Sequence, residues 1–166
     1  MGKREWLMSE RNLADDPIER FKDLSDRERD NLALLVRQCR GWSSQDIDVV
    51  VSVMAEDGVY HDITLPPAIG QDAIRKFGAR WLDAVPNLDL YIEAFCVQGN
   101  IVSNMGRMSG TITKDYFGLP GTGKSFDVPF SQLCFVENGK IKYLRGFWNA
   151  PDMYNQVGWE LSGLKR

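Results

Sequence analysis

The chain has 166 residues, a formal net charge of -3, 43% hydrophobic residues and 26% charged residues. This length fits one domain of ordinary size, and the composition is that of a globular protein, which excludes a disordered or fibrous chain. No long basic run is present, so a nucleic-acid partner is not expected.

Targeting segments and cysteine-based sites are not indicated either. The first eleven residues are rich in charge and lack the apolar stretch of a signal peptide. No segment approaches the roughly 20 apolar residues of a membrane-spanning helix. Cys39, Cys96 and Cys134 are odd in number and widely spaced, which favours neither a disulfide framework nor a zinc site. We therefore expect a cytoplasmic protein without membrane contact, cofactor or metal.

The N-terminal half is predicted to be helical. Residues 1–25 carry helically spaced apolar residues after Pro17 and indicate an extension packed on a domain spanning 26–166. Ser25, with Glu28 three residues later, resembles a helix N-cap, and the helix it starts is expected to end near Gly41. A further helix is expected from Ser43 or Ser44 up to Gly58.

The C-terminal half changes to strand periodicity. A short strand over 59–64, a proline-rich turn over 65–70 and a helix over 72–85 are followed by alternating segments. These predict four long strands, 88–97, 101–113, 125–136 and 141–148, with turns at Gly99-Asn100 and Asn138-Gly139. Interior glycines such as Gly106, Gly110 and Gly146 are typical of a strongly bent sheet. The pattern predicts an α+β cone with a small-molecule pocket.

The segment 118–125 spells a phosphate-binding motif, GLPGTGKS. Such a loop must lead into a helix, whose free amide groups and dipole form the anion site. Here it leads into an alternating segment interrupted by Pro129, which is strand-like. We interpret it as a hairpin loop with Lys124 in solvent.

The string VYHDITLPPAIGQDAI over 59–74, with GKSF over 123–126 and ENGKI over 137–141, resembles the limonene epoxide hydrolase family. The same order, with the Gly118-Leu119-Pro120 triplet and the ending over 148–158, is similar to the SnoaL-like polyketide cyclases. The resemblance covers about residues 30–158 and implies the NTF2-like cone. The resemblance says less about the reaction than about the fold, because this fold hosts many activities.

The resemblance also implies site residues. The water-holding Tyr and Asn of the epoxide hydrolases correspond to Tyr60 and Asp62 here. Their remaining catalytic positions fall near Gly106, Met108 and Gly146, and Gly146 also occupies the position of the catalytic Asp of the cyclases. The acid/base set of both branches is therefore replaced.

Three consecutive residues are the catalytic candidates. Tyr60 and Asp62 share one face of the predicted strand, and His61 takes the other. The resemblance favours Tyr60 and Asp62 facing inward, where a carboxylate in an apolar pocket can act as general base or acid. His61 is the single histidine of the chain and an alternative acid/base group.

Candidate substrate-binding residues come from the helix over 72–85 and from the strands. Of two possible hairpin registers, which place Phe130 opposite Phe147 or opposite Gly146, the second is preferred. It turns alternate residues of both strands inward. The predicted lining consists of Trp148, Phe130, Val128, Met108, Trp81 and Asn149. Arg107 and Arg145 are expected to face outward in structural ion pairs.

We expect an enzyme that binds a small, largely apolar metabolite of polyketide or terpenoid type. It would catalyse cyclisation, isomerisation or elimination without a cofactor. The alternatives are an epoxide hydrolase of the limonene epoxide hydrolase type and a non-catalytic ligand-binding module. Apolar residues on the outer sheet face also predict a homodimer; they are Phe147, Tyr143, Leu133 and Phe135.

Overall fold

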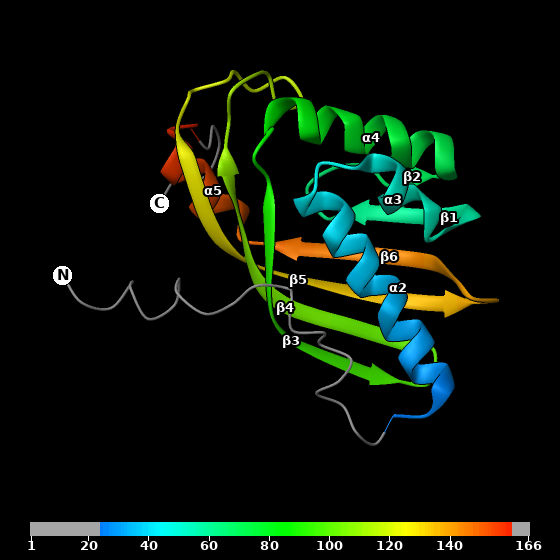
Figure 1. The fold of residues 1–166 in the computed structure, drawn as a ribbon. Coiled ribbons are helices and arrows are strands. Elements are labelled where there is room, and N and C mark those ends of the chain that lie inside the picture. The colour runs from blue at the N-terminus through cyan, green and yellow to red at the C-terminus, as the bar shows by residue number, and fades with distance from the viewer. Residues whose placement is uncertain (1–23, 161–166) are drawn as a thin grey trace, which may run out of the picture.

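A computed structural model describes residues 24–160 of the chain. Its centre is one curved sheet of six strands in the order β2-β1-β6-β5-β4-β3, with α2, α3 and α4 on one face (Figure 1). This arrangement confirms the predicted α+β cone. The extension predicted over 1–25 lies almost wholly outside the described residues. Within those residues, no helix has the length and apolar character needed to cross a bilayer.

Helices and strands occur in blocks along the chain: α2 and α3, then β1 and β2, then α4, then β3 to β6, and finally α5. The helices are α2 (Asp26–Ser43), α3 (Ile47–Ser52), α4 (Gln71–Ala84) and α5 (Ala150–Val157). The strands are β1 (Met54–Asp62), β2 (Ala68–Ile69), β3 (Asp89–Gln98), β4 (Ile101–Thr111), β5 (Ser125–Glu137) and β6 (Lys140–Trp148). All four predicted long strands are present, and α5 was not anticipated.

Helix α2 begins at the predicted capping box. The amide of Glu28 donates to Ser25 Oγ, and the Ser25 amide donates to the Glu28 carboxylate at 3.1 Å. Glu28 also accepts from the amide of Gly99 at 2.9 Å, and Asn31 donates to the Gly99 carbonyl at 2.8 Å. These neutral donors, the Gly99 amide first, lower the pKa of Glu28. The start of α2 is thereby hydrogen-bonded to the turn between β3 and β4.

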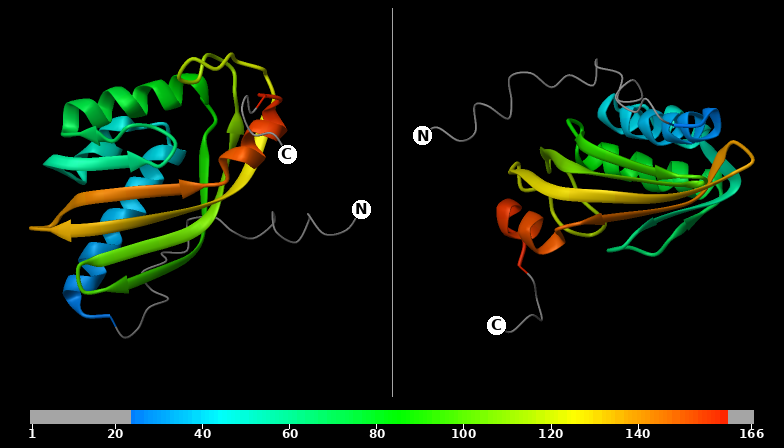
Figure 2. Two further views of the ribbon diagram at one scale, coloured as in Figure 1. Left: turned by 180° about the vertical axis from the view of Figure 1, so that it is seen from behind. Right: turned by 90° about the horizontal axis from the view of Figure 1, so that it is seen from below.

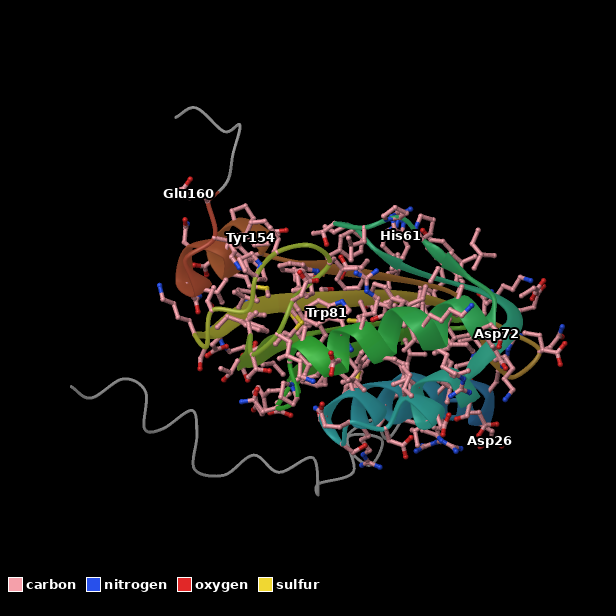
Figure 3. The ribbon with its side chains drawn as sticks, turned by 90° about the horizontal axis from the view of Figure 1, so that it is seen from above. Asp26, His61, Asp72, Trp81, Tyr154 and Glu160 are labelled. Carbon is pink, nitrogen blue, oxygen red and sulfur yellow. The ribbon has the colours of Figure 1, made fainter. Side chains whose placement is uncertain are left out.

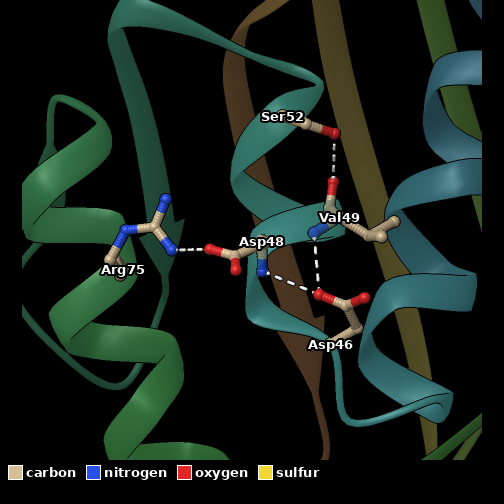
Figure 4. Close-up of polar contacts among 5 residues, drawn as sticks. All are labelled: Asp46, Asp48, Val49, Ser52 and Arg75. Atoms are coloured by element: carbon tan, nitrogen blue, oxygen red, sulfur yellow. Dashed lines mark hydrogen bonds and ion pairs between the residues drawn. The ribbon is translucent and has the colours of Figure 1, made fainter.

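Helix α3 is much shorter than the sequence indicated. Asp46 caps it by accepting from the amides of Asp48 and Val49, and Asp48 pairs with Arg75 of α4 (Figure 4). The prediction that this helix runs to Gly58 is wrong, because the chain enters β1 at Met54. Valine-rich segments favour strands as readily as helices, and the carbonyl of Val53 already accepts from Ile141 of the sheet.

The sheet is a meander of β3 to β6 with β1 added in parallel beside β6. Gly106 of β4 pairs with Ile92, beside a register irregularity between Ile92 and Ala94 of β3. A Cβ on Gly106 would lie 2.0 Å from the carbonyl oxygen of Tyr91. Only glycine permits this close approach of β4 to β3.

The β5–β6 hairpin has a register that neither sequence alternative described. Val136 pairs with Ile141 beside a two-residue turn, but a bulge then shifts the pairing so that Phe135 pairs with Tyr143. Phe130 consequently lies opposite Trp148 rather than Gly146. The preferred register is wrong in its pairs, although it turns the same residues inward, because the two registers differ by an even number of residues.

The glycine-rich segment forms a loop that closes on itself and leads into β5. The amides of Thr122 and Gly123 both donate to the Ile112 carbonyl, at 3.2 and 2.8 Å. Its end continues directly into β5 at Ser125. The segment offers no helix N-terminus for a phosphate group, as the alternation after Lys124 indicated.

Candidate active site

A cavity of about 40 Å³ lies between the inner sheet face and helices α2 and α4. This volume holds about one water molecule, since a water occupies about 30 Å³ in the liquid. Most of its wall is apolar and aromatic. The lining residues are Trp42, Tyr60, Asp62, Trp81, Leu88, Leu90, Met108, Phe130, Gln132, Gly146, Phe147 and Trp148.

Asp62 is the one ionisable carboxylate in this wall. It ends β1, is 6% exposed, and sits where the chain turns away from the sheet. Its Oδ1 accepts from the Thr64 amide at 2.9 Å and the Thr64 hydroxyl at 2.7 Å. The indole of Trp148 donates to both carboxylate oxygens at 3.1 Å. Asp62 is thus held by neutral donors.

Tyrosines surround this carboxylate. Burial raises the pKa of Tyr60 above that of an ordinary tyrosine, and the charge of Asp62 raises it further. Burial and then Asp62 have the same effect on the pKa of Tyr116 and of Tyr154, which belong to the loop after β4 and to α5. These hydroxyls remain protonated at neutral pH, so each can donate a hydrogen bond and none competes with Asp62 as a base.

Aromatic rings in and behind the cavity wall contact one another. Trp81 points inward from α4 (Figure 3) and meets Trp148 edge-on, with ring centroids 6.2 Å apart. Tyr60 lies 6.0 Å from Trp42 and 5.3 Å from Phe77, measured between ring centroids. Such tilted contacts are favourable ring geometries and hold the walls in place.

Buried amides form a polar floor. Gln132 accepts from Asn104 at 2.9 Å and from the thiol of Cys39 at 3.3 Å, and it donates to Gln38 at 3.3 Å. Its backbone amide donates to Asn104 at 2.8 Å. Because these partners fix Gln132 on several sides, the one amide side chain in the cavity wall has a set orientation.

Formal charge in the cavity is therefore limited to Asp62. None of the residues in the cavity wall is a lysine, arginine or histidine. Within residues 24–160, no three His, Cys, Asp or Glu side chains are grouped as a metal site would require. The chemistry that this arrangement itself offers is proton transfer between Asp62 and a ligand in an apolar pocket that contains hydrogen-bond donors.

The SnoaL-like polyketide cyclase family model matches residues 33–157. The chain belongs to this family. Among solved structures, a SnoaL-like protein from Jannaschia sp. CCS1 is similar with a TM-score of 0.76 and 22% identity. The alignment covers 82% of this chain and 97% of that one.

Two further structures widen the comparison. An LEH-like epoxide hydrolase from M. tuberculosis has a TM-score of 0.63 at 15% identity, over 77% of this chain and 89% of its own. A protein of ketosteroid isomerase-like fold from Catenulispora acidiphila, solved with trimethylamine, has a TM-score of 0.68 at 19% identity, over 76% of this chain and 93% of its own. At these identities the likeness is one of fold.

The structure brings most of the predicted residues of this SnoaL-like chain to the cavity. Tyr60, Asp62, Trp81, Met108, Phe130 and Trp148 all contribute to its wall. Val128 is fully buried but lies outside the wall. Asn149 instead accepts from the Asp152 amide at 3.2 Å as the N-cap of α5.

His61 lies on the opposite face of β1, at the outer margin of the sheet (Figure 3). Its Nδ1 lies 3.3 Å from the hydroxyl of Tyr143. The predicted alternation of Tyr60, His61 and Asp62 therefore holds, and it separates the histidine from the cavity. Arg107 forms the expected outward ion pair with Asp127 at 2.7 Å, whereas Arg145 donates to the Tyr143 hydroxyl at 2.9 Å.

Several residues of the site were not identified from the sequence. Gln132 continues the inward series of Val128 and Phe130, so its position was open to prediction even though its polarity gave no signal of burial. Trp42 ends the apolar stripe of α2 one turn beyond Cys39, a spacing that also indicates an inward position. Thr64 lies in a turn, where no periodicity applies.

Gly146 occupies the position where the resemblance implied a carboxylate. It lines the cavity, and a Cβ built on it would have no neighbouring atom within 4 Å. The space released by this glycine belongs to the cavity beside Asp62.

Proposed function

We propose that this protein is a cofactor-independent enzyme that catalyses cyclisation, isomerisation or elimination of a polyketide- or terpenoid-like metabolite by acid/base chemistry. The observation that carries the proposal is the single carboxylate of Asp62, buried in an aromatic cavity two residues from a protonated tyrosine. Membership of the SnoaL-like family supports the substrate class.

The proposed first step is the transfer of a proton from a carbon next to a substrate carbonyl to Asp62. The electrons of the broken C–H bond move into an enolate, whose oxygen accepts a hydrogen bond from Tyr60. Return of the proton to a different carbon gives isomerisation. Attack of the enolate carbon on a second carbonyl gives cyclisation, and the alkoxide that forms takes the proton back from Asp62. Departure of a β-substituent with its bonding electron pair gives elimination, and Asp62 then protonates the leaving group. All three outcomes need one base and one donor, which the cavity contains.

Substrate size sets a further requirement. A cavity of about 40 Å³ is much smaller than the roughly 300 Å³ or more of ordinary ligand sites, so a ring-sized substrate needs the wall to widen. Trp148 follows Gly146 on the inner face of β6 and lines the cavity. We propose that the Trp148 side chain moves aside when substrate enters.

The experiment is proton exchange at carbon, which needs no knowledge of the product. Cyclic β-diketones and β,γ-unsaturated cyclic ketones are incubated with the protein in D₂O, and loss of their α-proton signals is followed by NMR. Saturable exchange above the buffer rate is expected, together with conjugation of the unsaturated ketones. Tyr60→Phe should slow exchange by roughly 10²-fold, the loss typical of one oxyanion donor.

Epoxide hydrolysis is the second candidate, favoured by the room for water beside Asp62 and Tyr60. It is tested in parallel with cyclic terpenoid epoxides, by measuring diol formation. Diol production without carbon exchange would replace the proposal by a hydrolase. Saturable binding of the ketones with neither reaction would instead indicate a ligand-binding module.

A further inference from the structure

The two oxygens of Asp62 have different surroundings. Oδ1 accepts from three donor groups: the Thr64 amide at 2.9 Å, the Thr64 hydroxyl at 2.7 Å and the Trp148 indole at 3.1 Å. Among the described residues, Oδ2 accepts only from that same indole, at 3.1 Å. An oxygen with three donors has no free lone pair for a substrate proton, whereas Oδ2 does.

Thr64 holds its place without help from a ligand. The chain turns immediately after β1, and the amide of Leu65 donates to the carbonyl of Asp62 at 3.0 Å. This turn aims both the amide and the hydroxyl of Thr64 at one carboxylate oxygen, as in a side-chain-capped turn. The carboxylate plane is therefore fixed by residues next to it in sequence.

Trp148, unlike Thr64, donates to both oxygens of Asp62. Its indole Nε1 lies 3.1 Å from each oxygen, so its one proton is shared between two long contacts. Two shared contacts are weaker than one short one, and a small movement of the indole toward Oδ1 releases Oδ2 completely. Thr64, with its shorter bonds, keeps Oδ1 in place during such a movement.

We propose that Thr64 is a positioning residue, which holds Oδ1 of Asp62 and thereby makes Oδ2 the oxygen that exchanges a proton with substrate. The inference rests on the proposed function, because it assigns the reacting atom of the same base.

The test uses the carbon-exchange assay on the full chain with Thr64→Val and Thr64→Ser. Valine keeps the shape and removes the hydroxyl, so kcat should fall by at least about ten-fold while KM stays within about two-fold. The acidic limb of the pH–rate profile should move to higher pH, because the carboxylate loses a donor that favours its charged form. Serine restores the hydroxyl and should recover both properties.

The other groups near Asp62 do not produce this shift of the acidic limb of the pH–rate profile. Tyr60, Tyr116 and Tyr154 stay protonated across the acidic range, and His61 lies on the opposite face of β1. A structural role for Thr64 would lower the melting temperature and leave the pH profile in place. If Thr64→Val does not fold, Thr64→Ala replaces it, with the same expected loss and the same recovery by serine.

The outcomes separate the two proposals. Wild-type kcat and pH profile in Thr64→Val, with Asp62→Asn inactive, would overturn the role of Thr64 alone. Failure of Thr64→Ser to recover activity would also overturn it, since the hydroxyl would then not be the group that matters. Full activity in Asp62→Asn would remove the proposed base and the inference with it.

Discussion

Asp62 and His61 are adjacent residues that face opposite sides of one strand, which provides a matched pair of variants. Asp62→Asn keeps the side-chain shape and removes the ionisable group, so carbon exchange should fall by at least about 10²-fold while ligand binding persists. His61→Gln should leave the rate unchanged, because its ring contacts Tyr143 on the outer face. NMR exchange rates measure the reaction, and ligand titrations measure binding. The reverse pattern would place the site around His61.

The three cysteines differ sharply in reactivity. Burial raises the pKa of Cys39 to about 12 and also raises that of Cys134, so both stay as thiols at pH 8. Cys96 is exposed. Iodoacetamide at pH 8 should therefore modify Cys96 alone in the folded protein and all three cysteines in denaturant, as read by intact and peptide mass spectrometry. Rapid labelling of Cys39 in the folded state would contradict the closed floor of the cavity.

At the residue scale, the sequence was informative wherever alternation applied. It placed Tyr60 and Asp62 on the inner face and His61 on the outer one. It did not show Thr64 or Tyr116, because residues in turns and loops have no period. Nor did alternation reveal that Trp148 donates to Asp62, which depends on the parallel pairing of β1 with β6.

Among the elements, the bend of β4 depends on a missing side chain. Gly106→Ala would place a methyl group 2.0 Å from the Tyr91 carbonyl, so the backbone must shift, at roughly 1–3 kcal/mol in stability. Gly146→Ala is the control, since its methyl meets no atom within 4 Å. Thermal unfolding should show a lower melting temperature for Gly106→Ala only. Equal melting temperatures would mean that the bend does not need glycine.

Elements with strong turn signals were predicted well, and those without them were not. The strands β3 to β6 follow from alternation bounded by the Gly99 and Asn138-Gly139 turns. The boundary between α3 and β1 was misplaced because a run of valines suits both. Helix α5 was missed because it has only eight residues, although Asn149 and Pro151 are a typical start.

For the molecule as a whole, the outer sheet face carries most of the exposed large apolar side chains. Ile101, Met105, Phe135 and Phe147 are 38–56% exposed, on neighbouring strands. Figure 2 shows this face of the sheet free of the helices α2, α3 and α4. We therefore propose a homodimer through the outer face.

Sedimentation at tens of micromolar should give a species of twice 18.9 kDa. Phe135→Lys should shift it toward the monomer, because a charge would be buried in the interface. Asn155→Lys, on exposed α5, adds the same charge elsewhere and should not. A wild-type protein that sediments only as monomer would exclude this interface.

The loop over 118–125 leads to the last expectation for the whole chain. Titration with labelled ATP and magnesium should show no saturable binding, because the loop ends in β5 and not in a helix. Micromolar binding that disappears in Lys124→Ala would contradict the loop structure.

The bulge in β6 determines where the chain tolerates a change in length. Ile141 pairs with Val136 and Tyr143 with Phe135, so Lys142 is the residue without a counterpart on β5. Deleting Lys142 would leave every later pair of the hairpin intact and keep Trp148 beside Asp62. Deleting a residue between Leu144 and Phe147 would turn Trp148 to the opposite face and remove its bond to the carboxylate. A deletion at Lys142 thus removes its ion pair with Asp57 but preserves the site, whereas a deletion a few residues later destroys the site.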